Sequence, residues 1–87
     1  MSNPIGVQTQ PLSHLRVGEL AQVVALVGDR ETRYRLMDLG MVPGTRVEVL
    51  RSSPLGDPVV YRLRGTMVAL RRPDAEVVQV QCLEPAS

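Results

Sequence analysis

The sequence predicts a mainly β protein: a small five-stranded barrel with one α-helix inserted between strands 1 and 2. Apolar residues alternate with polar ones through 45–51 and 59–64, which is the two-residue period of a half-buried strand. A helical segment ends at Gly40, just before these runs, and a Pro-Gly pair and single glycines separate the segments. Hydrophobic residues make up 44% of the 87-residue chain, and they are almost all aliphatic, which suits the interior of a small barrel.

The chain begins with a predicted flexible leader, residues 1–11, which contains two prolines and several amide side chains. Ser13 is the expected cap of a short helical turn between Leu12 and Leu15. The first strand is predicted over 21–27. Alternation alone fits two inward-facing sets for this strand, which are Val24 and Leu26, or Val23, Ala25 and Val27.

The predicted helix covers 30–39. Asp29 precedes it and can accept a backbone N–H of its first turn. Gly40 follows it and can adopt the positive φ that commonly closes a helix. Pro43 and Gly44 then form a predicted turn, because Pro presets the φ that a turn needs and Gly accepts a positive φ at the next position.

The remaining predicted strands are 45–51, 59–64, 67–70 and 77–83. Val47 and Val49 are expected to face inward in the first of them. The PLGDP segment at 54–58 is predicted to be a rigid loop, because its two prolines cannot donate ladder hydrogen bonds. Gly65 and the Pro-Asp-Ala segment at 73–75 are predicted to turn the chain between the later strands.

Composition indicates one small domain, predicted over 12–83 and followed by a C-terminal tail at 84–87. The ten basic residues are all Arg and face nine acidic ones, so the net charge of +1 gives no bulk attraction to nucleic acid or anionic membranes. Without Lys the chain cannot form a Walker A phosphate loop. The start of the chain lacks the features of a signal peptide, and the longest strictly apolar run, 23–27, is far shorter than the about 20 residues of a membrane span. We therefore expect a cytoplasmic protein that does not insert into a membrane.

No metal-binding or catalytic set is recognisable in the sequence. His14 and Cys82 are the only residues of their kinds and lie 68 positions apart, whereas metal sites usually cluster their ligands. The acidic residues around the helix, Asp29, Glu31 and Asp38, are equally well explained as a cap and two solvated carboxylates. No Ser or Cys has a recognisable catalytic base, so we expect neither enzyme activity nor a cofactor.

A docking surface is the functional site that the sequence suggests. Leu39, Met41 and Leu55 are apolar residues near predicted loop ends, and Arg62 and Arg64 share a predicted strand face. An apolar patch rimmed by Arg is typical of a small interaction module, although the same residues also fit ordinary core, turn and solvated-strand positions. Nucleic acid is not expected as a partner, because single-strand binders stack bases on aromatic rings and this chain has two Tyr and no Phe or Trp.

The turn and strand residues also carry a family resemblance. A pattern L-x-x-L-G-x-x-P-G-x-x-V-x-V begins at Leu36, P-L-G-D-P follows at 54–58, and an R-G pair and an A-L-R run complete it. This order resembles the FeoA family of ferrous iron transport proteins over roughly residues 12–83. One departure is Thr66-Met67, where the family often has an aromatic residue. The turn residues of the pattern are Gly40, Pro43, Gly44, Pro54, Gly56, Asp57, Pro58 and Gly65.

The resemblance implies an SH3-like barrel and a non-catalytic accessory or regulatory role in bacterial ferrous iron uptake. It implies docking on the cytoplasmic GTPase region of a FeoB-type membrane transporter, with activation and inhibition both open. The alternative is a stand-alone SH3-like domain akin to the C-terminal domain of iron-dependent transcriptional repressors. A third interpretation, a direct iron carrier, is disfavoured by the scarcity of ligands, and self-association stays open.

Overall fold

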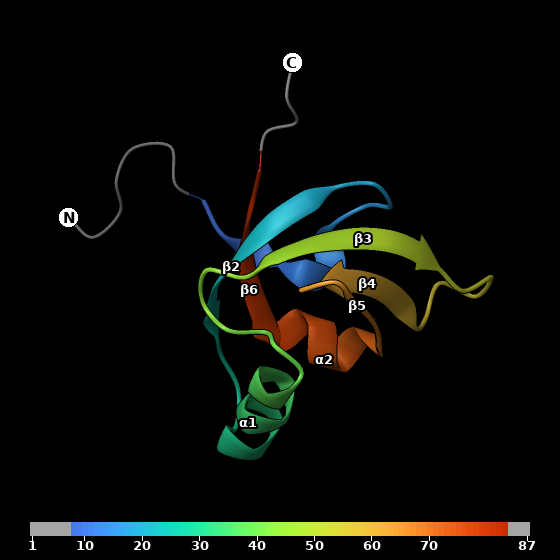
Figure 1. Ribbon diagram of the computed structural model, residues 1–87. Helices are drawn as coiled ribbons and strands as arrows, with labels where there is room; N and C mark the ends of the chain where they lie inside the picture. The colour runs from blue at the N-terminus through green and yellow to red at the C-terminus, as the bar shows by residue number, and fades with distance from the viewer. Residues whose placement is uncertain (1–7, 84–87) are drawn as a thin grey trace.

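The computed structural model describes residues 8–83, which form one antiparallel sheet with two α-helices and a short 3-10 helix (Figure 1). In chain order the strands are β1 Gln10–Pro11, β2 Leu20–Leu26, β3 Arg46–Ser52, β4 Val59–Leu63, β5 Thr66–Leu70 and β6 Val78–Cys82. The helices are η1 Leu12–His14, α1 Arg30–Asp38 and α2 Arg72–Val77. None of the helices within this part of the chain is long and apolar enough to cross a membrane.

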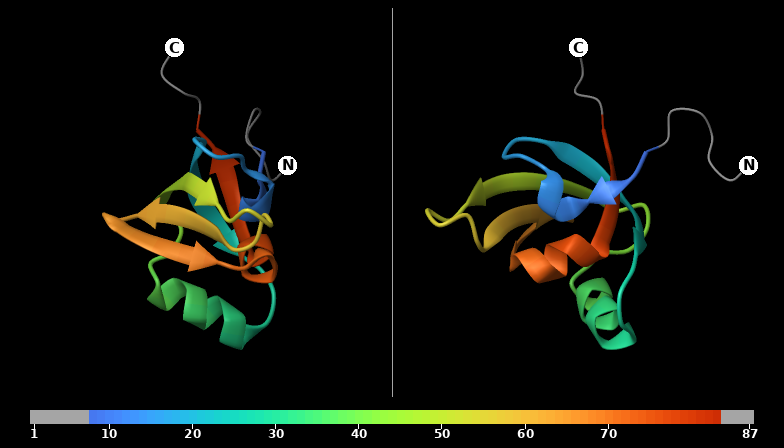
Figure 2. Two further views of the ribbon diagram at one scale, coloured as in Figure 1. Left: turned by 90° about the vertical axis from the view of Figure 1, so that its right-hand side faces the viewer. Right: turned by 180° about the vertical axis from the view of Figure 1, so that it is seen from behind.

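The sheet is strongly curled into a small barrel. Its strand order is β1-β6-β2-β3-β4-β5, so β2 pairs with both β6 and β3. The register shifts between Val23 and Ala25 in β2 and between Val49 and Arg51 in β3, and such bulges bend and twist a strand. The half of the sheet that contains β6 consequently crosses the half that contains β4 and β5 (Figure 2). The predicted mainly β barrel, with its helix α1 between β2 and β3, is confirmed.

The sheet has one short strand more than predicted. Gln10 and Pro11, which the sequence assigned to the flexible leader, form β1 and pair with β6. Two residues are too few to show an alternation, so this strand could not be found from the pattern. Ser13 is not the cap of η1, because Pro11 holds the cap position and no side chain caps this turn. Residues 1–7 of the predicted leader and the predicted tail, 84–87, lie outside the described residues.

The second difference is α2, where the sequence predicted only a turn at 73–75. Pro73 lies in the first turn of this helix, where N–H groups have no partner within the helix, so proline is tolerated there. The backbone N–H of Arg72 donates to the Asp57 carboxylate at 2.9 Å. Ala75 is buried against the barrel. Contacts with distant residues therefore hold this segment as a helix.

Helix α1 begins and ends within one residue of its predicted bounds. The Asp29 carboxylate accepts the backbone N–H of Thr32 at 3.3 Å, and hydrogen bonding to Thr32 lowers the pKa of Asp29. At the other end Gly40 has a φ of +107°, the left-handed conformation that closes a helix. A Cβ at Gly40 would lie 3.0 Å from Leu63 Cδ1, so the absence of a side chain lets the helix end approach β4 closely.

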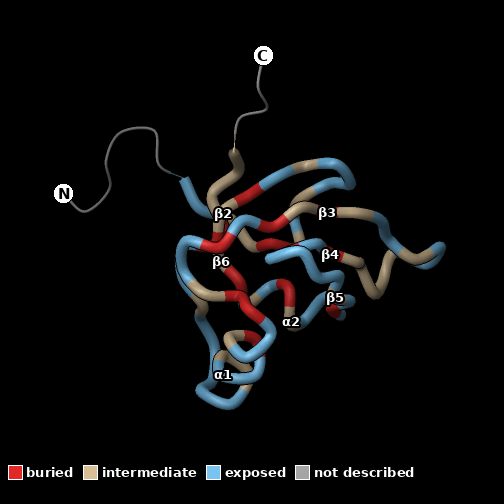
Figure 3. Tube along the Cα trace, viewed as in Figure 1, coloured by how far each residue is buried: buried red, intermediate tan, exposed pale blue. Residues whose placement is uncertain are grey.

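The core lies within the curl of the sheet (Figure 3). In β2, Ala21 and Val23 are buried, but beyond the bulge Ala25 is exposed and Leu26 packs against the core. The bulge shifts the phase of the alternation, so each of the two inward-facing sets left open by the sequence is right in part. The buried hydrophobic residues are Leu12, Ala21, Val23, Leu36, Met41, Val47, Val49, Tyr61, Leu63, Leu70, Ala75, Val78 and Val80.

Candidate docking surface

Three of the predicted docking residues lie around the turn between β4 and β5. Leu39 is the C-terminal cap of α1, and its exposed fraction is 43%. The next residue, Gly40, approaches Arg64, since a Cβ at Gly40 would lie 3.5 Å from Arg64 Cδ. Arg62 is exposed two residues before the turn residue Arg64. The structure thus places the end of α1, which contains Leu39, next to the turn that contains Arg64, with Arg62 on the adjoining strand.

Arg62 and Arg64 do not share a strand face, contrary to the prediction. Arg64 has a φ of +54° and Gly65 a φ of +73°, and these two residues form the turn itself. Arg62 lies on β4, where its guanidinium is 3.3 Å from a carboxylate oxygen of Glu48. Met67, which is 61% exposed, lies opposite Arg62 on β5. We call these residues the turn surface: Leu39, Arg62, Arg64 and Met67.

Met41 is not part of this surface. Its exposed fraction is 0%, so the prediction that it contacts a partner is wrong. The backbone N–H of Met41 donates to the Leu36 carbonyl at 3.1 Å, and that of Gly40 donates to the Met37 carbonyl at 2.9 Å. This pair of bonds is characteristic of a helix closed by a left-handed glycine. The chain reverses at Gly40, and Met41 enters the core.

Leu55 lies apart from the turn surface, in the loop 53–58 between β3 and β4. It is 94% exposed. The loop and the turn are at opposite ends of β4 (Figure 2). The five residues of β4, at about 3.3 Å each, separate them by roughly 16 Å. The sequence had joined Leu55 and Leu39 in one patch, whereas the structure separates them.

The predicted turn residues all lie in loops between elements. The four glycines among them have positive φ values of 73° to 107°, which residues with a Cβ rarely adopt. These positions are Gly40, Pro43, Gly44, Pro54, Gly56, Asp57, Pro58 and Gly65.

Residues 8–83 contain no group of three or more His, Cys, Asp or Glu side chains that could hold a metal ion. His14 is exposed at the end of η1. Cys82 is half-buried in β6, and its Sγ lies 3.9 Å from Glu19 Oε2. These last two residues border a cavity of about 130 Å³, which is also lined by Gly18, Leu20 and Leu83.

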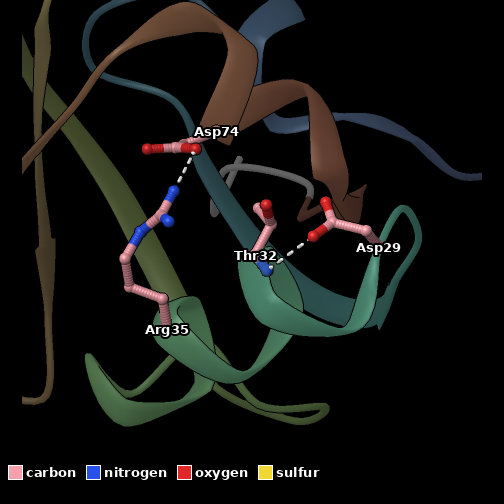
Figure 4. A network of polar contacts seen from close by, with 4 residues as sticks. All are labelled: Asp29, Thr32, Arg35 and Asp74. Atoms are coloured by element: carbon pink, nitrogen blue, oxygen red, sulfur yellow. Dashed lines mark hydrogen bonds and ion pairs between the residues drawn. The ribbon is translucent and has the colours of Figure 1, made fainter.

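Ion pairs connect elements around the barrel. Arg35 of α1 and Asp74 of α2 are 2.7 Å apart, as Figure 4 shows beside the Asp29 cap. Arg71 lies 4.0 Å from Asp57. Arg64 and Arg72 take part in none of the ion pairs among the described residues. Near the two ends of β5 there are therefore two Arg side chains without an ion pair, although the Asp57 carboxylate accepts the backbone N–H of Arg72.

Two features were not predicted from the sequence: the exposure of Met67 and the place of its strand, β5, at the edge of the sheet. The strand TMVAL contains no charged residue, which is unusual for an edge strand. That signal is visible in the sequence, but only the sheet order reveals that β5 is an edge.

The amino-acid sequence of the chain matches a known protein family. A model of the FeoA domain family matches residues 10–82. The chain is 38% identical over 72 residues to a fusion of Fe(2+) transport protein A and Fe(2+) transporter FeoB from Porphyromonas gingivalis. The match covers 83% of this chain and 8% of the fusion protein, so the chain corresponds to a small part of that relative.

Solved structures agree with this match. An FeoA-like protein from Clostridium acetobutylicum superposes with a TM-score of 0.84 at 29% identity, covering 92% of this chain and 93% of that one. FeoA of Stenotrophomonas maltophilia, an SH3 domain protein solved with zinc, gives 0.72 at 29% identity, covering 82% and 88%. A manganese-dependent transcriptional repressor gives 0.81 at 19% identity, covering 94% and 45%, which shows a common fold alone. The predicted SH3-like class is confirmed.

Proposed function

This chain belongs to the FeoA family, which is linked to ferrous iron transport, and from this premise we propose that it is a non-catalytic accessory protein of bacterial ferrous iron uptake. It docks on the cytoplasmic GTPase region of a FeoB-type membrane transporter. The contact biases the conformation of the transporter or its nucleotide cycle, because a ligand that prefers one state shifts the equilibrium toward it.

The observation that carries the proposal is the fusion of an FeoA-type domain to FeoB in one relative. A covalent link keeps two domains at an effective concentration on the order of millimolar, so even a weak contact between them persists. Such a link is useful where the two domains act on each other. The rest of that relative includes the transporter, and transport is therefore assigned to the partner and regulation to this chain.

The turn surface is the first contact in this proposal. Leu39 is the C-terminal cap of α1, and the next residue, Gly40, approaches Arg64 at the β4–β5 turn. An ordered apolar side chain next to Arg has the character of an interface anchor. Leu55, on the loop 53–58, is a second and separate apolar contact.

Binding of the purified chain to the cytoplasmic GTPase region of the transporter tests the proposal. We predict that Leu39→Glu weakens binding by more than about 1 kcal/mol, as expected for a desolvated anchor. Leu55→Glu shows in parallel whether the loop takes part. Val17→Glu is the matched control, since Val17 is also an exposed apolar residue, at 57%, and belongs to another loop.

The outcomes separate the surface from the function. If the wild-type chain does not bind the transporter region, the docking function is wrong. If it binds and both Leu variants bind equally well while folded by circular dichroism, docking uses another face. The GTPase rate of the region, with and without the chain, then distinguishes activation from inhibition.

The alternative, a stand-alone domain akin to the C-terminal domain of iron-dependent repressors, has support in fold alone. The likeness to the manganese-dependent repressor is at 19% identity, and no residue pattern of this chain adds to it.

A further inference from the structure

Strand β5 ends the sheet and leaves one edge open. In the strand order it pairs with β4 alone, and Figure 2 shows it as the outermost strand on its side. Within residues 8–83 no other segment supplies a hydrogen bond to its backbone. An edge of this kind presents a row of unpaired N–H and C=O groups.

The turn before β5 determines which groups are unpaired. Arg64 and Gly65 both have positive φ, as in a two-residue type I′ hairpin, so the flanking residues Leu63 and Thr66 form a hydrogen-bonded pair. Hydrogen-bonded pairs then alternate along an antiparallel ladder. Thr66, Val68 and Leu70 bond to β4, and the N–H and C=O of Met67 and Ala69 point toward the open edge.

The open edge lacks the protection that edge strands usually have. Natural proteins block such edges with charged side chains, proline or a bulge. The five residues of β5 include neither charge nor proline, and their register with β4 has no shift. Met67 and Ala69 are both exposed. The strand is therefore open to pairing with another extended chain.

A second copy of this chain is a poor occupant of the edge. A two-fold pairing that satisfies Met67 and Ala69 has its axis at Val68, so that Met67 faces Ala69 of the second copy. The same register brings the turn that contains Arg64 in each copy close to the start of α2 at Arg72 in the other, and symmetry repeats this approach of like charges. Neither side chain forms an ion pair among the described residues, and the carboxylate beside Arg72, that of Asp57, is already bonded to the Arg72 backbone N–H and lies 4.0 Å from Arg71.

We propose that the open edge of β5 binds an extended segment of the partner, flanked by acidic residues, by strand addition. The N–H and C=O groups of Met67 and Ala69 form the new ladder, and the Met67 side chain covers an apolar residue of the segment. Arg64 and Arg72 attract the acidic ends. The inference rests on the proposed function for the source of the segment, the cytoplasmic region of the transporter.

A proline at position 69 tests the edge, with that cytoplasmic region as the probe. Ala69→Pro removes an N–H that points away from β4, so no hydrogen bond of the sheet is lost. Ala69→Val keeps the N–H and is the matched control. We expect Ala69→Pro to weaken binding at least about tenfold and Ala69→Val to change it less than about twofold, since main-chain hydrogen bonds supply most of the affinity in strand addition.

Amide hydrogen exchange adds a readout that side-chain contacts would not change. In the free chain the Met67 and Ala69 amides should exchange fast, while those of Thr66 and Val68 exchange slowly. Binding of the transporter region should slow the exchange of the Met67 and Ala69 amides. If the transporter region binds without slowing them, the edge proposal is overturned and the docking function stands. This measurement on the wild-type chain also decides the matter if Ala69→Pro fails to fold.

If the transporter region does not bind, the proposed function fails. A synthetic peptide then tests whether the open edge of β5 pairs with an extended chain. The peptide has about eight residues, with alternating Val and Thr between Asp-Glu ends, which is an ordinary strand length. A peptide with Lys ends is the control. Slower exchange at Met67 and Ala69 with the acidic peptide alone supports the edge, and unchanged exchange with both peptides overturns it.

Discussion

Tyr61 illustrates at the residue scale how burial changes the chemistry of a side chain. It lies at the centre of β4 and is 2% exposed. Burial raises the pKa of Tyr61 from 10.0 to about 12, because the phenolate would lose its hydration. The folded chain therefore holds this proton more tightly than the unfolded chain does.

We predict that the chain loses stability as the pH rises from about 10 to about 12. The unfolded state releases the Tyr61 proton first, so the free energy of unfolding falls, by at most roughly 3 kcal/mol. Below pH 10 this contribution is fully present. Urea unfolding at several pH values in this range measures the slope of the free energy of unfolding against pH, and Tyr61→Phe should reduce that slope. Tyr34→Phe, at a ring that is 55% exposed, should retain it. Equal slopes for wild type and Tyr61→Phe would contradict the assignment.

Residues whose roles are local were predictable from the sequence. Asp29 caps α1 and Gly40 closes it, because both roles depend on a few neighbouring residues. Met41 and Arg64 were misassigned for a different reason. Whether Met41 faces the core, and whether Arg64 is in a strand or a turn, depends on how the barrel closes.

At the element scale, a buried apolar side chain and an ion pair both connect α1 to the rest of the domain. Leu36 is completely buried in the core. Arg35 forms its ion pair with Asp74 at 2.7 Å, but the two side chains are 55% and 28% exposed. Exposed ion pairs contribute about 1 kcal/mol or less, whereas deleting a buried Leu side chain costs about 2–5 kcal/mol. Apolar burial is therefore the main attachment of the helix.

This difference predicts losses of unequal size for two neighbouring substitutions. Leu36→Ala should lower the free energy of unfolding by about 2–5 kcal/mol, and Arg35→Ala by less than about 1 kcal/mol. Urea unfolding in low salt compares them directly, with Leu36→Met as a control that nearly conserves volume. A larger loss for Arg35→Ala than for Leu36→Ala would show that the ion pair dominates.

The elements that the sequence failed to predict depend on contacts between distant segments. β1 exists because Gln10 and Pro11 pair with β6. Helix α2 has the Arg72 N–H bonded to Asp57, 15 residues earlier in the chain. The phase shift in β2 follows from a bulge opposite β6. The longer runs were found because their alternation is a property of the local sequence alone.

For the whole molecule, a net charge of +1 conceals an uneven distribution of charge. Arg62 and Arg71 lie near carboxylates, but Arg64 and Arg72 do not form ion pairs within the described residues. The sequence placed Leu39 near a loop end and Arg64 on a strand face, whereas the structure brings the end of α1 next to the turn that contains Arg64. The sequence could not show that Leu55 lies at the opposite end of β4, because that separation is a property of the folded sheet.

The charge of Arg64 should act on the rate of encounter with the transporter. We predict that Arg64→Glu slows association several-fold at about 0.02 M salt and much less at about 0.3 M, because the Debye length contracts over this range. The dissociation rate should change less than about twofold if Arg64 lies at the rim of the interface. Leu39→Glu should instead speed dissociation.

Binding kinetics at the two salt concentrations check this division of roles. Arg30→Glu makes the same charge reversal at the far end of α1 from Leu39, so it is the matched control for net charge. At about 0.3 M salt it should leave both rates nearly unchanged, because the Debye length there, roughly 6 Å, is shorter than the roughly 13 Å length of α1. At about 0.02 M salt the Debye length is roughly 20 Å, so Arg30→Glu should slow association, but less than Arg64→Glu does. If Arg64→Glu associates like wild type at low salt, Arg64 lies outside the rim, and Leu39 alone anchors the turn surface.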